Sequence, residues 1–584
     1  MALFGRVNSN TISLLNHCYC KKLIMGTSRL RSHDRISIST IKQHKNNKQD
    51  LYLTIVITES IYETEIVKRR HQACRSLLIQ VYSSKSHNDL HNYCSQFGDI
   101  SSMHHYHINN QQNYILIEFK DIVSIKEIMS FASFIKGDIM SIKSSILWFR
   151  KGQIITPQKN NQRKVSLFVQ NGCTLPNENE RAKLLCNAKS ISAQIIIFYE
   201  MMKLTDLEVR LRFHTAHHLE QYFSKLFENI KVLPFGSSMN GFGRKRCDLD
   251  LVLIPDTEEH NSTSRLIFHS KFMNNSNRYE TKEFLRILAD SMQYFIPGIL
   301  NVRRILEARV PIIKFYYNYT QTECDLSATN MTAIYMTELL NLYGEMDWRI
   351  RPLVITIRAW AKNQELTSDV PGQWITNFPL TLLVLFFLQQ KKILPSLKIL
   401  KLYSTDNDVR CAENGIDCTF LRDINKLPPD YKYKINQDSL ETLLYDFFKF
   451  YSTFDFQKYG ICIREGVQIR KPSRSALYIT NPLETTLNVS KNVSLYELNR
   501  IISKTHDAIY TLETTDKFGS NGWGIMTLLK INNSNGDLKK SKRQMKNIEE
   551  YSEDSYENFY EISDKFEVSE ANIDETKTKK KEIV

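Results

Sequence analysis

The stretch "DLDLVLI", which begins at Asp248, constrains the fold of this chain more than any other segment. Leu249, Leu251 and Leu253 alternate with other residues, a pattern that predicts a β-strand with one buried face. Because side chains two apart on a strand share a face, Asp248 and Asp250 should lie side by side. Two neighbouring carboxylates repel each other, so a partly buried pair favours a bound cation, and oxygen ligands suit Mg²⁺ or Mn²⁺. The alternative is a pair of exposed aspartates at a strand edge.

A second feature lies just upstream, where "KVLPF" predicts a strand that is followed at once by Gly236 and Ser237. Glycine lets the backbone approach a phosphate group closely, and the serine hydroxyl adds a hydrogen-bond donor. The segment contains neither the GK[ST] of a Walker loop nor a dinucleotide-binding fingerprint. These residues therefore indicate a phosphate-binding turn of another kind.

A strand that ends in Gly-Ser, followed by Asp-x-Asp on the next strand, resembles the DNA polymerase β-like nucleotidyltransferase superfamily. The resemblance implies a third carboxylate on a later strand. "PIIKFYY" and "TECDLS" predict two strands joined by a polar turn, and Asp325 on the second fits that position. Glu323 shares its face and is the alternative.

Further segments resemble one branch of this superfamily, the noncanonical poly(A) and terminal uridylyl polymerases. "PLVITIRAWAKNQEL" and "WITNFPLTLLVLFFLQ" are similar to its helical domain, and "NPLETTLNVSKNVS" is similar to its poly(A)-polymerase-associated segment. The resemblance extends from about residue 73 to 525, and a basic N-terminus points to the mitochondrial members.

The resemblance implies a role for each residue that matches a family motif. Asp248, Asp250 and Asp325 would hold the metals and carry catalysis. Residues in several segments would bind the nucleotide, and these are Gly236, Ser237, Asn330, Thr337, Arg358, Lys362, Asn377 and Phe378. Arg358 stands where the family usually has lysine, and Phe378 stands at the aromatic position that stacks on the incoming base. For two of these residues a bland role is the alternative, since Phe378 lies in an apolar helix that packs in a core and Lys362 on a helix would usually be a solvated charge.

Two departures from the family pattern concern the choice of base. The family's "DPF" reads Asn481-Pro482-Leu483 here, and Leu487 stands where many uridylyltransferases carry histidine. The loss of that polar partner argues against a strict choice of UTP and is compatible with adenine.

The expected fold class is α+β. It comprises a nucleotidyltransferase palm, built of a mixed sheet with helices, and a helical poly(A)-polymerase-associated domain, preceded by a small RNA-recognition-motif-like α+β domain. The expected division of the chain is a transit peptide at 1–45, a linker at 46–72, the small α+β domain at 73–150, a linker with helices that pack on the helical domain at 151–215, the palm at 216–330, the helical domain at 331–530 and a disordered tail at 531–584.

The small domain is predicted from its order of strand, helix, two strands, helix and strand. Its strand "NYILIEFK" offers Tyr114 and Phe119 but lacks the glycine-aromatic signature of an RNA-reading strand. A packing or dimerising role is therefore at least as plausible as base recognition. Farther along, His214, His217 and His218 are interpreted as a polar helix face, because no carboxylate or cysteine lies at a metal-binding spacing.

Composition and the N-terminus indicate location and partners. The formal net charge of +14 suggests a polyanionic partner, and 11 cysteines without paired CxxC spacings indicate a reducing compartment. The first 33 residues lack acidic side chains and carry scattered Arg, Lys, Ser and Leu, which is the composition of a mitochondrial transit peptide, so we expect the matrix. The longest apolar run, "FPLTLLVLFFL", is too short to span a bilayer.

The sequence therefore predicts a template-independent polymerase that adds adenylate from ATP to the 3′ end of mitochondrial RNA. It would use two Mg²⁺ or Mn²⁺ ions and release pyrophosphate. Homodimerisation through the small α+β domain is a further expectation from the resemblance. The alternatives are a terminal uridylyltransferase, an RNA-binding protein that has lost catalysis and, with less support, a double-stranded-RNA-activated oligoadenylate synthetase.

Overall fold

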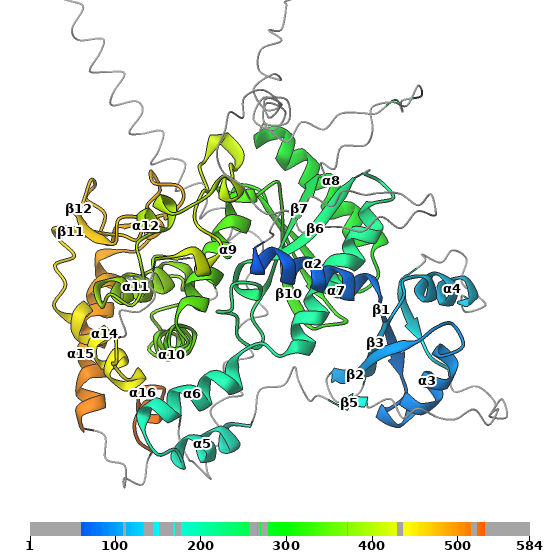
Figure 1. The fold of residues 1–584 in the computed structure, drawn as a ribbon, viewed down its shortest axis with the longest axis horizontal. Coiled ribbons are helices and arrows are strands. Elements are labelled where there is room, and N and C mark those ends of the chain that lie inside the picture. The colour runs from blue at the N-terminus through cyan, green and yellow to red at the C-terminus, as the bar shows by residue number, and fades with distance from the viewer. Residues whose placement is uncertain are drawn as a thin grey trace, which may run out of the picture. The chain divides into compact units, whose positions relative to one another are not determined.

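The computed structural model describes residues 60–531 with internal gaps (Figure 1). The residues left out within this range are 109–111, 134–143, 151–166, 170–176, 228, 256–265, 267–268, 270–277, 369, 371, 429–435 and 515–521. The predicted transit peptide and the predicted tail, except for Ile531, lie outside the described residues.

The palm is built on a five-stranded sheet in the order β6-β7-β10-β9-β8. The central strands β7 and β10 are parallel, whereas the other neighbours are antiparallel. Leu249, Leu251 and Leu326 point from the central strands into a core that α7 and α8 cover, and all three are fully buried. The elements are α7 (Asp206–Phe223), β6 (Ile230–Phe235), β7 (Leu249–Pro255), α8 (Arg278–Phe295), β8 (Ile299–Ile305), β9 (Ile312–Tyr317) and β10 (Thr322–Ala328).

A helical domain follows the palm and contains the largest core of the described chain. Residues 379–388 of the run "FPLTLLVLFFL" are buried in α11, as expected for a helix that is apolar on all sides. A three-stranded sheet in the order β12-β11-β13 belongs to the same domain. The elements are α9 (Met331–Met346), α10 (Ile350–Asn363), α11 (Asn377–Gln390), α12 (Leu397–Leu402), α14 (Leu440–Ser452), β11 (Tyr459–Cys462), β12 (Val467–Arg470), β13 (Ile479–Thr480), α15 (Leu495–Thr514) and α16 (Ile525–Leu528). Two earlier helices, α5 (Glu178–Cys186) and α6 (Ile191–Met202), pack on this domain.

The small N-terminal domain has the predicted order of strand, helix, two strands, helix and strand. Its sheet, in the order β4-β1-β3-β2-β5, gains a fifth strand from residues 167–169, which the sequence placed in the following linker. Its last two strands run parallel to their neighbours, β4 to β1 and β5 to β2. The elements are β1 (Ser76–Val81), α3 (His87–Cys94), β2 (Ile100–Ile108), β3 (Gln112–Phe119), α4 (Val123–Phe131), β4 (Ile146–Trp148) and β5 (Leu167–Val169).

Both faces of this small sheet are covered. Phe119 is buried in the core that the sheet shares with α3 and α4, whereas Tyr114 packs with Tyr106 against Leu207 and Leu211 of α7. The hydroxyl of Tyr106 donates to the carbonyl of Tyr319 in the palm at 2.7 Å. The face that stacks bases in an RNA-recognition motif is therefore occupied by the palm, which is the packing role that the sequence left open.

Residues 61–72 fall in the predicted linker, but the structure has a helix there, α2 (Ile61–Cys74). Ser60 and Glu63 form a capping box at its start. Ala73 is its buried residue, so the apolar periodicity that reveals a helix in a sequence is weak. Ion pairs from Arg69 to Asp206 and from Arg70 to Glu220 instead attach it to α7.

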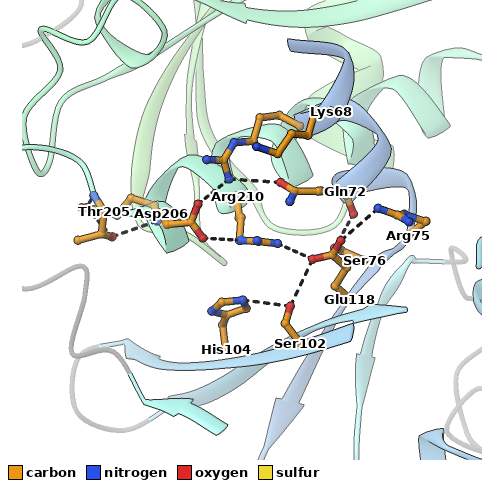
Figure 2. Close-up of polar contacts among 12 residues, drawn as sticks. Lys68, Gln72, Arg75, Ser76, Ser102, His104, Glu118, Thr205, Asp206 and Arg210 are labelled. Atoms are coloured by element: carbon orange, nitrogen blue, oxygen red, sulfur yellow. Dashed lines mark hydrogen bonds and ion pairs between the residues drawn. The ribbon is translucent and has the colours of Figure 1, made fainter. Parts of the chain in front are cut away.

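A polar network joins α2, α7 and the small sheet (Figure 2). Glu118 of β3 is buried and accepts from Arg210 of α7 at 2.6 Å and from Arg75, after α2, at 3.3 Å. Arg210 also donates to Asp206 at 2.6 Å. The three parts of the chain are thus connected by charge pairs as well as by apolar contacts.

The prediction of a polar face for the histidines of α7 is wrong for two of them. His214 is 3% exposed and His218 is 1% exposed. His218 Nδ1 lies 2.6 Å from the hydroxyl of Tyr317, and burial lowers the pKa of each histidine to about 3. They are neutral core residues, because α7 is enclosed by the palm sheet on one side and by the small sheet on another.

Candidate active site

The two central strands bring the predicted carboxylates together. Asp250 on β7 and Asp325 on β10 are direct partners in the parallel register, and Asp248 immediately precedes β7. Each projects away from the leucines that enter the core, as the alternation predicts. Glu323 lies two residues before Asp325 on the same face, beside Tyr316 of β9.

Lys314 of β9 completes this group of charges, although the sequence analysis did not select it. It is the antiparallel partner of Asp325, and its Nζ lies 3.3 Å from Asp325 and 3.6 Å from Asp248. Burial alone would lower the pKa of Lys314, but Asp325 and Asp248 together raise it. The alternation in "PIIKFYY", which buries Ile313 and Phe315, is the signal that could have placed Lys314 on the catalytic face.

Burial and the neighbouring charges both raise the pKa of two of these carboxylates. Burial, followed by the charges of Asp325 and Asp248, raises the pKa of Asp250 to about 7. Burial also raises the pKa of Asp325, which Lys314 partly offsets. Such clustered acids are stable as anions only beside positive charge.

The donor set fits a divalent metal of the magnesium type. Asp325 Oδ1 is buried, and among the described residues its carboxylate forms an ion pair with Lys314. Asp248 and Asp250 supply further carboxylate oxygens from β7 and the residues just before it. In the part of the chain that the structure describes, no group of three or more His, Cys, Asp or Glu side chains is gathered tightly enough to hold an ion.

The Gly-Ser turn lies directly against these carboxylates. Gly236 begins a 3₁₀ turn that ends at Ser238, and it has φ +66°, a conformation that favours glycine. A Cβ at this position would lie 2.1 Å from Asp250 Oδ2. The Gly236 N–H donates to Thr337 Oγ1 at 2.9 Å, so the turn is also held to α9.

Arg212 fixes the turn from below and was also missed by the sequence analysis. It is buried on α7 and donates to Ser238 Oγ at 3.0 Å and to the carbonyl of Cys247 at 2.6 Å. The Ser238 hydroxyl in turn donates to the carbonyl of Asp248 at 3.3 Å. One arginine thus ties the Gly-Ser turn to the start of β7. Its position among the apolar residues of α7 was the available signal.

A cleft of about 1140 Å³ opens above the carboxylates, between the palm and the helical domain. Its wall includes every residue predicted to bind metal or nucleotide except Asp325, which lies beside Lys314 in the sheet. The cleft is larger than most sites for one small molecule, so it has room for a nucleotide and the end of a second substrate. Arg244, Arg246, Arg278, Arg303 and Arg309 also line it and suit an anionic ligand.

The predicted nucleotide-binding residues of the helical domain differ in the contacts that they make within the protein. Arg358 donates to Thr381 Oγ1 at 2.9 Å and to the carbonyl of Phe242 at 2.9 Å, which braces the loop after the Gly-Ser turn. Asn330 caps α9 and accepts from the N–H of Ala333. Phe378 is half-buried in the first turn of α11.

Glu413 is a further residue of the wall that the sequence did not reveal. Its carboxylate accepts from the N–H groups of Met331 and Thr332 at the start of α9. The contact joins residues that are 82 and 81 positions apart, so no local pattern could have predicted it.

Two family models match this chain. One, described as the central palm domain of mitochondrial-like poly(A) RNA polymerase, matches residues 191–345. The other, described as Cid1 family poly A polymerase, matches residues 439–487. The fold and the site thus define a nucleotidyltransferase palm joined to a helical poly(A)-polymerase-associated domain, as the sequence predicted.

Relatives narrow the class further. The mitochondrial poly(A) RNA polymerase of Drosophila melanogaster is 40% identical over 468 residues, which cover 78% of this chain and 76% of the relative. The Homo sapiens enzyme of the same name is 35% identical over 477 residues, covering 79% and 80%. A crystal structure of mtPAP with ATPγS is 32% identical with a TM-score of 0.72, covering 81% of this chain and 99% of that one. The chain belongs to the family of mitochondrial poly(A) RNA polymerases, and the prediction of a polynucleotide adenylyltransferase is confirmed.

Proposed function

We propose that the cleft is where this chain transfers adenylate from ATP to the 3′ end of RNA. The observation that carries the assignment is the parallel pairing of Asp250 with Asp325, at the base of a cleft that the Gly236-Ser237 turn also lines. Asp248, Asp250 and Asp325 would hold two Mg²⁺ or Mn²⁺ ions. Such ions assist attack by the 3′-hydroxyl on the α-phosphate and stabilise the leaving pyrophosphate.

The protein's own side chains supply position and charge. Gly236 and Ser237 would hold the triphosphate, with Lys362 across the cleft as a point charge. Arg358, engaged with Thr381 and Phe242, would act mainly by fixing the cleft wall. Asn330 and Thr337 border the region expected for the ribose, and Phe378 would stack on the base, with Asn377 beside it. Catalysis in this scheme rests on orientation and charge compensation rather than on a covalent intermediate.

The choice of ATP over UTP is supported by Asn481, which lines the cleft, and by Leu487, which stands where many uridylyltransferases carry histidine. Asn481 Oδ1 accepts from the N–H groups of Leu483 and Glu484, so asparagine serves the turn in which the family has aspartate. Asn488 is engaged with Ile479 and Leu477, and the preceding Leu487 offers no polar group to uracil.

The test is extension of a labelled RNA by each nucleoside triphosphate supplied separately with Mg²⁺ or Mn²⁺. Solved mtPAP structures hold ATPγS, UTP, CTP or GTP, so extension must be measured rather than binding. We expect extension with ATP at least tenfold faster than with UTP. Faster extension with UTP would support the uridylyltransferase alternative.

We propose that the protein is located in the mitochondrial matrix. The names of the relatives and the basic N-terminus support the mitochondrion. None of the described helices is long and apolar enough to cross a membrane. Import of a fluorescent fusion, with and without residues 1–45, tests the location. A fusion that localises equally without them would contradict a transit role.

Homodimerisation through the small α+β domain is also proposed. Part of one sheet face packs on α7, and Tyr82, Phe131 and Trp148 are exposed apolar side chains of this domain that a second copy could cover. Sedimentation of the full chain and of a triple variant with serine at these positions tests this. An unchanged oligomer in the variant would exclude this surface.

A further inference from the structure

One row of side chains crosses the palm sheet at the level of the carboxylates. The pairing of neighbouring strands runs from Arg303 on β8 through Lys314 on β9 and Asp325 on β10 to Asp250 on β7. Direct cross-strand partners lie on the same face of a sheet. Arg303 therefore shares the catalytic face at the edge of the sheet, and its side chain is 57% exposed.

A β-bulge sets this orientation. Leu300 pairs with Tyr316 and Arg303 with Lys314, so two residues of β8 oppose one residue of β9. The first of the two, Asn301, has φ +54°. A bulge re-aims the side chains that follow it and is frequent beside active sites. Without this one Arg303 would face the core side, where its neighbour Arg304 in fact forms an ion pair with Asp290 of α8.

The next row of the same face runs from Leu300 on β8 through Tyr316 on β9 to Glu323 on β10. Tyr316 of β9 is half-buried beside Glu323, and its partner Leu300 on β8 is 46% exposed. Glu323 lies 3.8 Å from Arg303 and 4.0 Å from Lys314, so its charge is countered on two sides. A cationic group next to a half-exposed ring is the combination that holds single-stranded nucleic acid, the cation on a phosphate and the ring under a base.

We propose that the last nucleotides of the acceptor RNA lie over β9 and β8, with a phosphodiester against Arg303 and a base against Tyr316. The assignment rests on the proposed function, because it places the RNA on the side of the carboxylates opposite the Gly236-Ser237 turn. Arg309 lines the cleft after β8 and forms an ion pair with Glu484, which connects this edge of the palm to the helical domain. An acidic protein would use the charge but not the ring, so RNA is the occupant that the two rows together favour.

The test is equilibrium binding of a 5′-labelled oligoadenylate to the full chain without nucleotide, followed by fluorescence anisotropy at several salt concentrations. Arg303→Gln should weaken binding by about three- to tenfold and reduce the salt slope by about 0.7, the value for one single-strand phosphate contact. Arg304→Gln is the matched control, since it removes the same charge one residue away on the opposite face, and it should leave both quantities unchanged.

A second pair of variants tests the ring. Tyr316→Leu should weaken RNA binding by about tenfold without changing the salt slope, whereas Tyr316→Phe should retain wild-type affinity. Binding of a fluorescent ATP analogue should be unaffected in all four proteins.

The two kinds of failure are distinguishable because binding needs no turnover. A wild-type protein that binds RNA but does not extend it would count against the proposed function. Equal RNA affinity and salt slope in Arg303→Gln and Arg304→Gln, or wild-type affinity in Tyr316→Leu, would overturn the assignment of this surface.

Discussion

Lys314 places an ammonium group among the carboxylates that are to bind metal. Its Nζ lies within 4.0 Å of carboxylate oxygens of Asp248, Glu323 and Asp325 and forms an ion pair with each of them. A lysine in this position neutralises the cluster while metal is absent, and it competes with an incoming cation for the same oxygens.

Replacement of this ammonium should therefore favour the metal. In Lys314→Met, calorimetric titration with Mn²⁺ should give binding about tenfold tighter than wild type, because one repulsive and competing charge is gone. Lys282→Met is the control. It removes a lysine of α8 that is paired with Glu307, and it should not change the affinity for Mn²⁺. Weaker Mn²⁺ binding in Lys314→Met would mean that the ammonium helps to assemble the site.

The buried histidines predict how stability depends on pH. Their folded-state pKa values of about 3 lie below the ordinary 6.5, so only the unfolded chain binds these protons at mildly acidic pH. The stability that His214 and His218 contribute is present above pH 6.5 and is lost as the pH falls towards 3. At pH 5 each should have cost about 2 kcal/mol.

His214→Gln removes one of these titrating groups. Between pH 6 and pH 5 its free energy of unfolding should fall less steeply than that of wild type, by about 1.2 kcal/mol per pH unit. Urea unfolding at pH 7, 6 and 5 measures this difference. Parallel pH profiles would show that His214 is not held neutral.

At the scale of elements, the Gly-Ser turn depends on the contact between Gly236 and Asp250. Gly236→Ala should reduce the rate of RNA tailing by about a hundredfold, because the new Cβ displaces the carboxylate by an ångström or more. Gly415→Ala is a matched control, since Gly415 also has a positive φ, +73°, and a Cβ there would meet nothing within 4 Å.

Both glycine variants should lose about 1 kcal/mol of stability from the left-handed backbone. Only Gly236→Ala should lose activity. Equal activity in the two proteins would contradict the close approach of the turn to Asp250.

Sequence alternation was sufficient to predict β7 and the shared face of Asp248 and Asp250, because both depend on neighbours within one strand. The pairing of Lys314 with Asp325 depends on register between strands, which a short apolar pattern does not specify. Helix α2 was missed because charge pairs to α7, rather than an apolar stripe, hold it in place. The packing of Tyr106 and Tyr114 against α7 could not be predicted from the sequence. An aromatic residue on a strand gives the same sequence pattern whether its ring faces RNA or another domain.

At the scale of the whole molecule, the small sheet and the palm are connected through buried charges. Arg210→Met would leave Glu118 with Arg75 as its remaining arginine partner, and breaking a buried pair typically costs about 3 kcal/mol or more. We expect a melting temperature several degrees lower than wild type. Lys120→Met, which removes the exposed pair with Asp99, should cost less than about 1 kcal/mol. Equal melting of the two variants would contradict a structural role for the network.

The central claim is that Asp248, Asp250 and Asp325 form the catalytic set, with Glu323 outside it. The most direct measurement is the rate of ATP-dependent RNA tailing in Asp325→Asn and Glu323→Gln, two isosteric changes two residues apart on one strand. We expect a loss of about a thousandfold in Asp325→Asn and a rate within about tenfold of wild type in Glu323→Gln. Near-normal tailing by Asp325→Asn, together with an inactive Glu323→Gln, would contradict this claim.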